Sequence, residues 1–520
     1  MRWRDGHFLS ERLSATRSEF KEELPKRIQS LRSDNDHPSV TSCHLPLARE
    51  AIRIGDFIMK AAIILAGGKG TRMKSEQPKV MCEVIFEPMI SYVVRAVKEA
   101  GVEDICVITG YKHGIVEGYL EKLDSNIKTA LQEPQLGTGH AVMQAREFIS
   151  GHMEDDILIL NGDGPLMDAD TINKAYQYHK DNNNAITLIS AVVDDTHGIG
   201  HIKRDKNGTL LKIVEDKDAT EEEKKIMEAN AGVYWFKGEE LLYAINNIKN
   251  NNAQNEYYLT DALEILIKRG RNKGAYVCEN SEAVLGANDR IQLMDLNTIM
   301  RRNINNAHML SGVDIPCTDG VMIGKNVKIG NSAQILPNTI IIGDTEIGEN
   351  CVIGPNCYIK DSKIGIGVVL DNCKITDSVI EDGVDCGPFV KVRANSVLKK
   401  DVHIGNFVEV KNSVVGEGTK SAHLTYIGDS DVGAGVNFGC GTVTCNYDGK
   451  NKTRCKIGDG AFIGCNTNLI APVEVGDMAY IAAGSTITDD IPSDALSIAR
   501  AKQVNKEGWV KRKKPYKEKK

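Results

Sequence analysis

The chain has 520 residues, of which 26% are charged and 41% are hydrophobic, and its formal net charge is −7. This length predicts two or three domains, and the composition is typical of soluble globular proteins. No apolar run approaches the roughly 18 residues that would cross a bilayer, so no membrane partner is expected. The negative net charge offers no basic footprint, so no nucleic-acid partner is expected either.

The 13 cysteines are scattered along the chain, and none forms a C-x-x-C pair. Neither a zinc ribbon nor a redox motif is therefore indicated. We expect free thiols in a reducing compartment, and we place the protein in the cytoplasm.

Residues 1–58 show no sustained helical or strand period. They lack the apolar core of a secretory signal, and Glu and Asp are too frequent for a transit peptide. Met59 then opens "MKAAIILAGGKG", which is typical of the start of a strand. We expect residues 1–58 to be a disordered or non-native extension and Met59 to begin the folded protein.

Residues 59–286 alternate β-rich and helix-like segments. Strands are predicted at 61–66, 104–110, 156–163 and 185–193, and a helix at 89–101 that Gly101 ends. This alternation predicts an α/β domain with a mostly parallel, Rossmann-like sheet covered by helices on both faces. Residues 287–310 form a predicted helical linker, because Leu293, Leu296, Met300 and Ile304 recur at helical spacing.

A six-residue period begins after residue 311. Its aliphatic positions are Ile323, Ile329, Ile335, Ile341, Ile347, Ile353 and Ile359, and later Ile457, Ile463, Leu469, Val475, Ile481 and Ile487. Hexads of this kind predict a β-helix, here over 311–490, with one aliphatic residue per hexad in the core. The register breaks between about 360 and 456, where we expect insertions that form binding loops. The tail 491–520 ends in a basic run, either a solvated terminus or an arm that meets a phosphorylated ligand.

The segment "LAGGKGTRMKSEQPK" (65–79) follows the first predicted strand. It matches neither the P-loop nor the dinucleotide fingerprint. A glycine-rich turn still exposes backbone N–H groups to phosphate oxygens, and Arg72 and Lys79 add cations. Asp163, at the end of the strand 156–163, is a carboxylate suited to Mg²⁺, although a turn or N-cap role is equally open at this point.

These residues resemble a known family. The 65–79 segment is similar to the motif of sugar-1-phosphate nucleotidylyltransferases. Further stretches resemble the bifunctional N-acetylglucosamine-1-phosphate uridylyltransferase/glucosamine-1-phosphate N-acetyltransferase family, namely "LQEPQLGTGHA" (131–141), "IVEDKDAT" (213–220), "NNAQNEYYLTD" (251–261) and "GANDRIQL" (286–293). The resemblance is collinear over about 59–510.

The resemblance implies a nucleotidyltransferase domain followed by a left-handed parallel β-helix. It implies acetyl transfer from acetyl-CoA to glucosamine-1-phosphate, and then attack of the product's phosphate on the α-phosphate of UTP with release of pyrophosphate. It also implies Mg²⁺ as cofactor and a homotrimer whose acetyl site lies between subunits.

The resemblance carries roles onto the first domain. Arg72 and Lys79 would be catalytic and would hold the triphosphate with Gly68. Asp163 and Asn288 would bind Mg²⁺. The positions implied to bind UTP or the sugar nucleotide are Leu65, Ala66, Gly67, Gly68, Lys79, Gln132, Gly137, Thr138, Gly200, Glu215, Asn230 and Asn288. Of these, Gln132, Gly137 and Thr138 would read the uracil, and Gly200, Glu215 and Asn230 would hold the N-acetylglucosamine.

Four stretches depart from the usual family pattern. Asn161-Gly162-Asp163 replaces Tyr-Gly-Asp, and Gly198-Ile199-Gly200-His201 replaces Gly-Tyr-Gly-Arg. Asn230-Ala231-Gly232 replaces Asn-Thr-Gly, and Phe86-Glu87 replaces Gly-Lys. The phosphate and metal positions are retained, so these changes bear on the sugar side.

His423, in "SAHLTYIGD", lies where the hexads break. Acetyl transfer to an amino sugar needs a group that removes a proton from the ammonium, and a neutral histidine is suited to this. The resemblance implies His423 as catalytic base, with Glu409 orienting or polarising it. Positions implied to hold glucosamine-1-phosphate are Arg393, Lys411, Tyr426 and Asn437, and those implied to contact acetyl-CoA are Cys440, Asn446, Tyr447, Cys465, Ala483 and Arg500.

Two other functions stay open at this point. One is a monofunctional sugar-1-phosphate nucleotidylyltransferase whose β-helix is structural or regulatory. The other is a non-catalytic regulatory subunit that keeps the fold.

Overall fold

The computed structural model describes residues 59–194, 196, 198–252 and 254–515. They belong to a compact unit that spans Met59–Lys520. A second unit, Met1–Ile58, lies outside the described residues, and with it the prediction for residues 1–58. Among the described residues, no helix is long and apolar enough to span a membrane.

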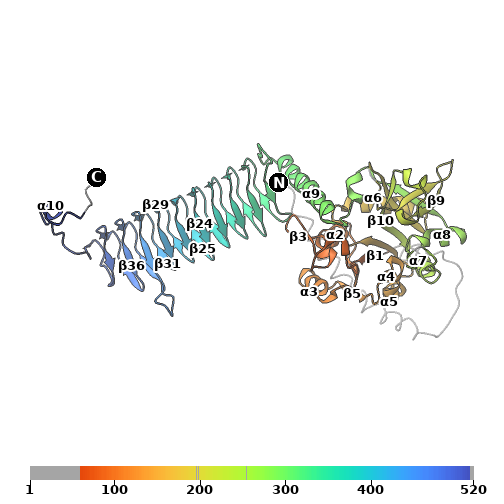
Figure 1. The fold of residues 1–520 in the computed structure, drawn as a ribbon, viewed down its shortest axis with the longest axis horizontal. Helices are drawn as coiled ribbons and strands as arrows, with labels where there is room; N and C mark the ends of the chain where they lie inside the picture. Colours follow the sequence, from red (N-terminus) through yellow and green to blue (C-terminus); the bar gives the residue numbers. More distant parts are fainter. Residues whose placement is uncertain (1–58, 195, 197, 253, 516–520) are drawn as a thin grey trace, which may run out of the picture. The chain divides into compact units, whose positions relative to one another are not determined.

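The first domain is built on a nine-stranded sheet, in the order β11-β7-β10-β6-β1-β4-β5, with β8 paired to β10 and β9 paired to β8 (Figure 1). The strands are β1 (Lys60–Leu65), β4 (Asp104–Thr109), β5 (Lys128–Leu131), β6 (Asp156–Asn161), β7 (Ile186–Val192), β8 (His201–Arg204), β9 (Leu210–Val214), β10 (Glu228–Lys237) and β11 (Lys273–Val277). β1 pairs in parallel with β4 and β6, whereas β10 runs antiparallel to β6 and β7. The mostly parallel sheet is confirmed, and the four predicted strands are β1, β4, β6 and β7.

Helices cover both faces of this sheet. They are α2 (Met89–Glu99), α3 (His113–Leu123), α4 (Thr138–Gln144), α5 (Arg146–Gly151), α6 (Ala169–Asp181), α7 (Gly238–Ile245) and α8 (Asp261–Lys268). Alternate residues of β1 point to opposite faces: Ala62 and Ile64 pack with α2, α3 and α6, and Ala61 and Ile63 pack with α4, α5, α7 and α8. Each of these side chains is fully buried, and burial of one isoleucine contributes about 1.5–3 kcal/mol.

Shorter elements complete the domain. A two-stranded ribbon is formed by β2 (Glu83–Val84) and β3 (Glu87–Pro88). Single 3₁₀ turns are η3 (Thr71–Met73), η4 (Lys79–Met81), η5 (Asp216–Asp218), η6 (Glu223–Lys225) and η7 (Ser281–Val284).

The predicted linker is α9 (Arg290–Leu310). Asp289 caps it, because its carboxylate accepts hydrogen bonds from the Ile291 and Gln292 backbone N–H groups at 2.9 and 3.0 Å. The predicted apolar face, Leu293, Leu296, Met300 and Ile304, is buried.

The second domain is a β-helix with three flat faces of short parallel strands. One face contains β12 (Met322–Ile323), β15 (Ile340–Ile342), β18 (Tyr358–Lys360), β21 (Lys374–Thr376), β24 (Lys391–Arg393), β27 (Glu409–Lys411), β30 (Tyr426–Gly428), β33 (Val443–Cys445), β36 (Asn468–Ile470) and β39 (Thr486–Ile487). The second contains β13 (Lys328–Ile329), β16 (Glu346–Ile347), β19 (Lys363–Ile364), β22 (Ser378–Ile380), β25 (Ser396–Leu398), β28 (Val414–Val415), β31 (Ser430–Val432), β34 (Cys455–Ile457) and β37 (Val473–Val475). The third contains β14 (Gln334–Ile335), β17 (Val352–Ile353), β20 (Val369–Leu370), β23 (Asp385–Cys386), β26 (His403–Asn406), β29 (Lys420–His423), β32 (Asn437–Phe438), β35 (Phe462–Ile463), β38 (Tyr480–Ile481) and β40 (Leu496–Ser497).

The hexad isoleucines form the core of these coils, since Ile335, Ile341 and Ile353 are fully buried. β40 pairs with β38 and lies beyond residue 490, where the β-helix was expected to end. α10 (Trp509–Lys513) is a single short helix in the basic tail.

The expected insertions between 360 and 456 are wrong for most of that range. Residues that pair on successive coils are separated in the sequence by the length of one coil, and Ile340 and Tyr358 mark a regular coil. Tyr358 and Lys374 are closer together in the sequence than this, and so are Glu409 and Tyr426, so these coils are shorter. The hexad register therefore breaks because coils shorten. Left-handed Asp and Asn residues at the corners, such as Asp361, Asp377 and Asn412, let the chain turn in fewer residues.

One true insertion remains in the described part of the β-helix. The coil that pairs Val443 with Asn468 is longer than the regular coil, and its extra residues leave the stack between β33 and β34. This extruded loop (446–454) closes on itself by the Tyr447–Lys452 bridge and is visible beside β31 and β36 in Figure 1.

Candidate active sites

A cavity of about 430 Å³ opens at the carboxyl ends of β1 and β6. The two strands are paired in register, so Leu65 and Asn161 end them side by side and both line the cavity. Ligands of parallel α/β sheets bind at this edge. The cavity brings together seven of the predicted residues: Leu65, Thr138, Asp163, Gly200, Glu215, Asn230 and Asn288.

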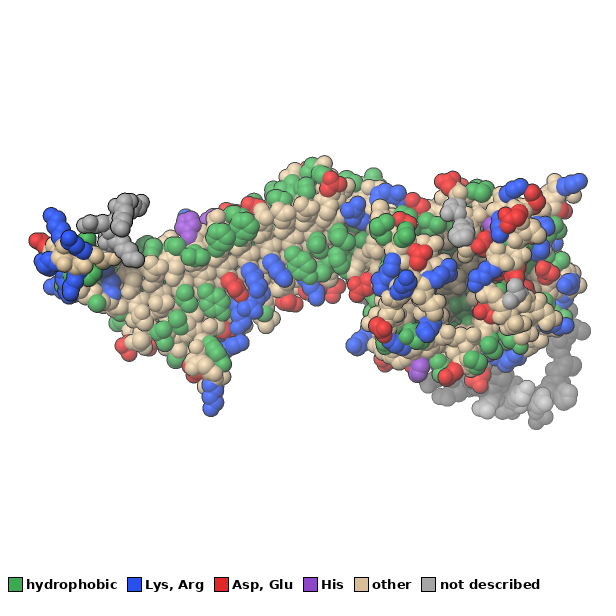
Figure 2. Space-filling model, viewed as in Figure 1, with side chains coloured by type: hydrophobic (Ala, Val, Ile, Leu, Met, Phe, Trp, Pro, Cys, Tyr) green, Lys and Arg blue, Asp and Glu red, His purple; other side chains and the backbone are tan. Residues whose placement is uncertain are grey.

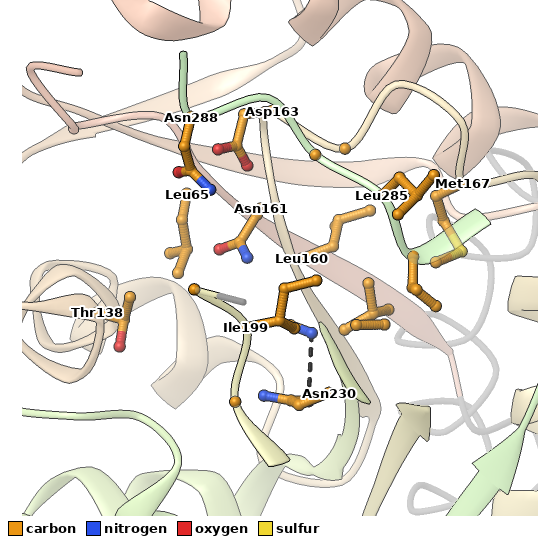
Figure 3. Close-up of a pocket in the computed structure, with 18 of the residues that line it drawn as sticks. Leu65, Thr138, Leu160, Asn161, Asp163, Met167, Ile199, Asn230, Leu285 and Asn288 are labelled. Carbon is orange, nitrogen blue, oxygen red and sulfur yellow. Dashed lines mark hydrogen bonds between the residues drawn. The ribbon is translucent and has the colours of Figure 1, made fainter. Parts of the chain in front are cut away.

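Lys79, Asp163 and Asn288 meet at one side of this cavity. The Lys79 ammonium forms an ion pair with Asp163 and donates to Asn288 Oδ1 at 2.8 Å. Figure 3 shows the Asp163 and Asn288 side chains next to each other. Residues that are far apart in the sequence therefore share one polar centre.

This centre fits a divalent cation. Two oxygen atoms, one of them from a carboxylate, already converge on a single positive charge, and oxygen donors are what Mg²⁺ prefers. No group of three or more His, Cys, Asp or Glu side chains that could hold a metal occurs among the described residues, so water and substrate phosphates would complete the coordination. The helix cap near this position is Asp168, which accepts from Thr171 N at 2.7 Å, and Asp163 is therefore free of that role.

The 65–79 segment is folded tightly beside these residues. A β-carbon on Gly67 would lie 2.8 Å from Gln132 Oε1, and one on Gly70, whose φ is +62°, would lie 2.7 Å from the Lys79 β-carbon. Gly70 therefore has to be glycine for Lys79 to keep its position, from which it contacts Asp163 and Asn288. Gly68 has open space around it, and Arg72 on η3 is exposed.

The predicted uracil-reading residues form a connected group. Gln132 is buried and its Nε2 donates to the Gly137 carbonyl at 3.0 Å. Gly137 begins α4 with φ +100°, and a β-carbon there would lie 2.7 Å from the Tyr257 carbonyl oxygen. Thr138 Oγ1 accepts from Leu259 N at 3.0 Å. Seven predicted nucleotide or catalytic residues do not line the cavity in the described part of the chain, namely Ala66, Gly67, Gly68, Arg72, Lys79, Gln132 and Gly137.

The opposite wall of the cavity carries Glu215 and Asn230. Glu215 accepts from Thr260 Oγ1 at 3.1 Å, and burial raises the pKa of its carboxyl. It is thus a wall residue and not a solvated loop residue. Asn230 N donates to the Gly200 carbonyl at 2.8 Å, and its side chain donates to the Tyr234 hydroxyl at 2.7 Å.

Acidic groups surround this wall. Burial raises the pKa of Asp261, at the start of α8, to about 6, and the neighbouring carboxylates of Glu264, Glu215 and Asp218 act in the same direction. Burial and the neighbouring negative charges therefore disfavour the ionised form of a carboxyl group beside Glu215, unless a cation pairs with it.

The sequence patterns missed several lining residues. Ile199 and Asn161 were noted as departures without an assigned contact, and both line the cavity, as Figure 3 shows. Thr260 lies within the quoted stretch 251–261 and could have been found there. Met167, Tyr234 and Leu285 belong to no motif, so only the fold reveals them.

On the β-helix, His423 begins a column of residues that repeats from coil to coil. Asn406 pairs with His423, and the register of the next strands places Cys440 beside His423, Cys465 beside Cys440, and Ala483 beside Cys465. Backbone bonds confirm the stacking: Asn466 N donates to Cys440 O at 2.8 Å, and Gly484 N donates to Cys465 O at 2.7 Å.

The column ends at a cation. A β-carbon on Gly484 would lie 3.7 Å from Arg500 Cδ, so the Arg500 side chain passes the coil that carries Ala483. His423, Cys440, Cys465, Ala483 and Arg500 are all exposed. This acetyl-site column (His423, Cys440, Cys465, Ala483, Arg500) thus collects the predicted base and four of the six predicted acetyl-CoA residues.

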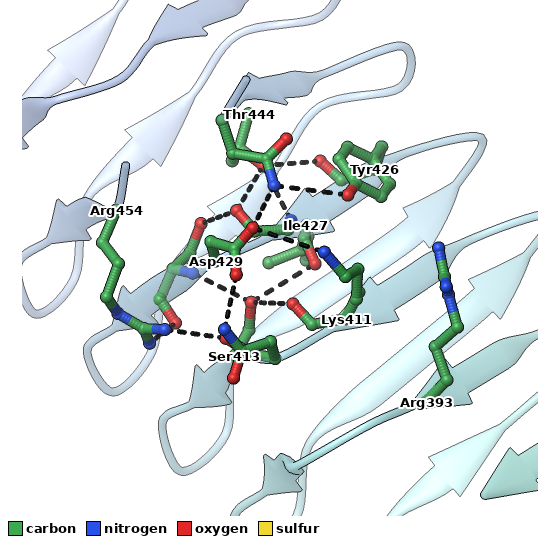
Figure 4. Close-up of polar contacts among 12 residues, drawn as sticks. Arg393, Lys411, Ser413, Tyr426, Ile427, Asp429, Thr444 and Arg454 are labelled. Carbon is green, nitrogen blue, oxygen red and sulfur yellow. Dashed lines mark hydrogen bonds and ion pairs between the residues drawn. The ribbon is translucent and has the colours of Figure 1, made fainter. Parts of the chain in front are cut away.

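A polar network lies on the adjacent face (Figure 4). The buried Asp429 accepts from Asn412 Nδ2 at 2.5 Å and from Asn446 Nδ2, and the Lys411 ammonium lies 3.5 Å from it. Burial opposes ionisation of Asp429, but these donors lower its pKa overall. Asn446 Nδ2 also lies 3.5 Å from the Tyr426 hydroxyl.

Asp429 was not among the predicted site residues, although it closes the quoted motif "SAHLTYIGD". Arg454 fixes the base of the extruded loop, since it contacts Asp431 and donates to the Ser430 and Asn412 carbonyls at 3.1 and 2.9 Å. This clamp holds Asn446 and the exposed Tyr447 at the loop's start.

Glu409 lies on a different face from His423. It forms an ion pair with Arg393 Nε at 2.6 Å, and among the described residues no contact joins it to His423. Arg393 therefore stands apart from the Asp429 network, as Figure 4 shows. Asn437, on β32, is exposed one coil after Lys420.

Comparisons with known proteins agree with this division. The nucleotidyl transferase family matches residues 61–305, and the bacterial transferase hexapeptide family (six repeats) matches residues 326–361 and 454–489. The gap between the two hexapeptide matches is the region where the coils shorten. The fold and sites thus define a nucleotidyltransferase joined to a left-handed β-helix of the hexapeptide transferases.

Relatives along the whole chain are more specific. The chain is 49% identical over 449 residues to the bifunctional protein GlmU of Caldanaerobacter subterraneus subsp. tengcongensis, covering 86% of this chain and 97% of that protein. It is 47% identical over 452 residues to bifunctional protein GlmU of Clostridioides difficile, with 87% and 97% covered. The corresponding Streptococcus thermophilus protein is 45% identical over 449 residues, with 86% and 97% covered. The chain belongs to the bifunctional GlmU family.

Proposed function

We propose that the chain makes UDP-N-acetylglucosamine in a fixed order, with acetyl transfer on the β-helix first and uridylyl transfer in the α/β domain second. As a member of its family, the chain is a bifunctional transferase with glucosamine-1-phosphate acetyltransferase and N-acetylglucosamine-1-phosphate uridylyltransferase activities, and it serves UDP-N-acetylglucosamine and cell-wall biosynthesis. The order and the residues that carry each step are the proposal.

For uridylyl transfer, Lys79 and Arg72 hold the UTP phosphates with the backbone of the 65–79 segment. Gln132, Gly137 and Thr138 bind the uracil, and Glu215, Asn230 and Gly200 bind the acetylated sugar. The sugar phosphate attacks the α-phosphate and pyrophosphate leaves. The work of the protein is to position the two phosphates and neutralise their charge, which needs little side-chain acid–base chemistry.

Nucleotidyltransferases of this family generally use Mg²⁺. We assign Asp163 and Asn288 as its protein ligands, because their oxygens already converge on the Lys79 ammonium. The ion, when bound, supplies charge neutralisation at the phosphates.

For acetyl transfer, His423 takes a proton from the ammonium of glucosamine-1-phosphate. The amine then attacks the thioester carbonyl, the C–S bond breaks, and the coenzyme A thiolate leaves and takes up a proton. Arg393 and Lys411 provide cations for the sugar phosphate, and Glu409 holds Arg393 in place. Tyr426 lies on the same face as these cations, whereas Asn437 lies on the face that carries His423. Asn446 and Tyr447, at the start of the extruded loop, complete the cofactor site with Cys440, Cys465, Ala483 and Arg500.

The observation that carries the acetyl site is its column. An exposed imidazole, three small side chains and an arginine follow one another on successive coils. Small side chains leave a path for an extended thioester, and the arginine suits phosphates. A structural β-helix without a second activity would need none of this arrangement, which disfavours the monofunctional alternative.

The proposed pathway is tested by incubating the purified chain with glucosamine-1-phosphate, acetyl-CoA, UTP and Mg²⁺, and by omitting each in turn. Free coenzyme A should appear without UTP, whereas pyrophosphate should appear only when acetyl-CoA or preformed N-acetylglucosamine-1-phosphate is present. Pyrophosphate release from glucosamine-1-phosphate and UTP alone, at the full rate, would contradict the order.

We also propose that the β-helix assembles as a homotrimer. Phe389, Phe407 and Leu424 occupy equivalent corners of successive coils with φ of +62°, +61° and +36°, where the neighbouring corners carry Asn or Gly. The two phenyl rings stack 5.3 Å apart at an interplanar angle of 4°. Each of the three side chains is 57–58% exposed.

Bulky apolar residues in the left-handed region are unfavourable by roughly 1 kcal/mol or more each, and their exposure adds a further cost. Burial against a second copy of the chain offsets both. Figure 2 shows that apolar side chains remain on the surface of the β-helix. Leu424 follows His423 directly in the chain, so a partner copy packed on Phe389, Phe407 and Leu424 would close the acetyl site.

The twelve cysteines of the described part are free, which fits the cytoplasmic location that we propose.

A Phe407→Asp variant tests the trimer. A charge in place of the Phe407 ring should convert the trimer to monomers and reduce acetyl transfer, while uridylyl transfer persists. Mass measured by light scattering, together with both activities, checks this result. Ile366→Asp, at another exposed apolar corner (52% exposed), is the matched control and should stay trimeric. A trimeric Phe407→Asp protein would refute the assignment of this face.

A further inference from the structure

His201 lies behind the wall of the sugar pocket and not in it. It opens β8 and is only 1% exposed, and it is absent from the cavity lining of the described residues. Its backbone pairs with Val214 and Ala229, which directly precede Glu215 and Asn230 in the sequence. A buried imidazole therefore stands directly behind two proposed sugar-binding residues.

Both nitrogens of this ring face acceptors. Nδ1 lies 3.1 Å from the Ile226 carbonyl oxygen, and Nε2 lies 3.4 Å from Asp216 Oδ1. A neutral imidazole carries one N–H and can satisfy only one of them. The doubly protonated ring satisfies both, and its contact with Asp216 is then charge-assisted.

Asp216 links His201 to the pocket, because its two carboxylate oxygens contact different groups. Its second oxygen, Oδ2, accepts from the Gly198 backbone N–H at 3.0 Å, and Gly198, Ile199 and Gly200 all line the cavity. Asp216 also follows Glu215 directly in the chain. One carboxylate therefore fixes two parts of the sugar wall.

The other charged groups nearby are engaged elsewhere. Glu223 on η6 accepts from Lys203 at 2.8 Å, and Lys212 lies 3.6 Å from it. Glu228 on β10 is held by Arg204 and by Ser190 Oγ at 2.7 Å. Among the described residues, Asp216 is the carboxylate recorded against the His201 ring.

We propose that His201 is a positioning residue for N-acetylglucosamine-1-phosphate, acting through Asp216 on the Gly198–Gly200 segment and on Glu215. The inference rests on the proposed function, in which Gly200 and Glu215 hold the sugar. It concerns binding of the sugar phosphate alone, because the side-chain contacts recorded for His201 and Asp216 among the described residues do not include Lys79 or the proposed metal ligands.

The test uses the full-length chain with His201→Leu, His201→Arg and Asp216→Asn variants. Loss of one charge-assisted hydrogen bond should raise the KM for N-acetylglucosamine-1-phosphate roughly tenfold in His201→Leu and Asp216→Asn. The KM for UTP and kcat should stay within about threefold, since the interaction acts on sugar binding. His201→Arg keeps a permanent charge opposite Asp216 and should restore the KM toward that of the wild type.

A double variant separates positioning through Asp216 from a purely structural role. The double variant His201→Leu/Asp216→Asn should be no worse than either single variant.

Acetyl transfer by the same chain is the internal control and should be unchanged in every variant. An unchanged KM for the sugar, an equal rise in the KM values for UTP and sugar, or a double variant clearly worse than both single variants would overturn the inference. If His201→Leu fails to fold, the near-isosteric Asp216→Asn decides it. Failure of the underlying assignment is distinguishable, because Glu215→Gln would then leave the sugar KM of an otherwise wild-type chain unaltered.

Discussion

Replacing His423 with alanine should lower the rate of acetyl transfer by about 10²–10⁴-fold, the usual contribution of a general base. The amino group of the sugar would then have to lose its proton to water. Uridylyl transfer should be unaffected, because it takes place in the α/β domain. Both rates can be followed on one preparation, as free thiol from coenzyme A and as pyrophosphate.

His403→Ala is the matched control for this variant. His403 lies one coil earlier on the same face, on β26, where it bonds Asp385 Oδ2 at 2.9 Å and stands outside the acetyl-site column. It should keep acetyl transfer within about twofold of the wild type, since exposed ion pairs contribute little. Full acetyl transfer by His423→Ala, or equal loss in the two variants, would remove His423 from the mechanism.

The second large effect is expected for Asp163→Asn. The change keeps the shape of the side chain but removes the only carboxylate charge that faces Lys79 in the described structure. Uridylyl transfer should fall about 100-fold or more, because charge neutralisation at the phosphates depends on the metal that this carboxylate would hold. The remaining activity should need a higher Mg²⁺ concentration, which a Mg²⁺ titration of pyrophosphate release would show.

Asp170→Asn controls for loss of a carboxylate in the same domain. Asp170 forms an exposed pair with Lys174 at 2.7 Å on α6, and its removal should change the rate by less than about twofold. Acetyl transfer should be normal in both variants. If Asp163→Asn kept the wild-type rate and Mg²⁺ dependence, another set of ligands would have to hold the ion.

The local geometry also explains why Lys79 and Asp163 contact each other. With two acceptors nearby and no other cation recorded against them in the described part, the Lys79 ammonium takes the central position between Asp163 and Asn288. Under the proposed function, Asp163 and Asn288 would hold the metal and the Lys79 ammonium would pair with phosphate oxygens.

Much of the fold was predictable because its signals are local and periodic. The buried strands of the α/β domain are short apolar runs, and the hexad isoleucines repeat because each coil gives them the same environment. The helix α9 was predictable for the same reason, since its buried residues recur at helical spacing. The antiparallel strand β10 was not, because its pairing partners β6 and β7 are distant in the sequence and its pattern does not encode direction.

The sequence by itself determined the two-part architecture, the glycine-rich phosphate segment and the identities of the charged residues near it. It could not show the shortened coils. A deletion and an insertion both shift the six-residue period, so the broken period alone does not tell which of them occurred. Only the tertiary structure decided the acetyl-site column. The strand register places its members at unequal intervals along the chain, since the extruded loop lies between Cys440 and Cys465, and unequal coils leave no period to read. The same holds for His201, whose effect on the sugar wall passes through Asp216 and depends on two strands lying side by side.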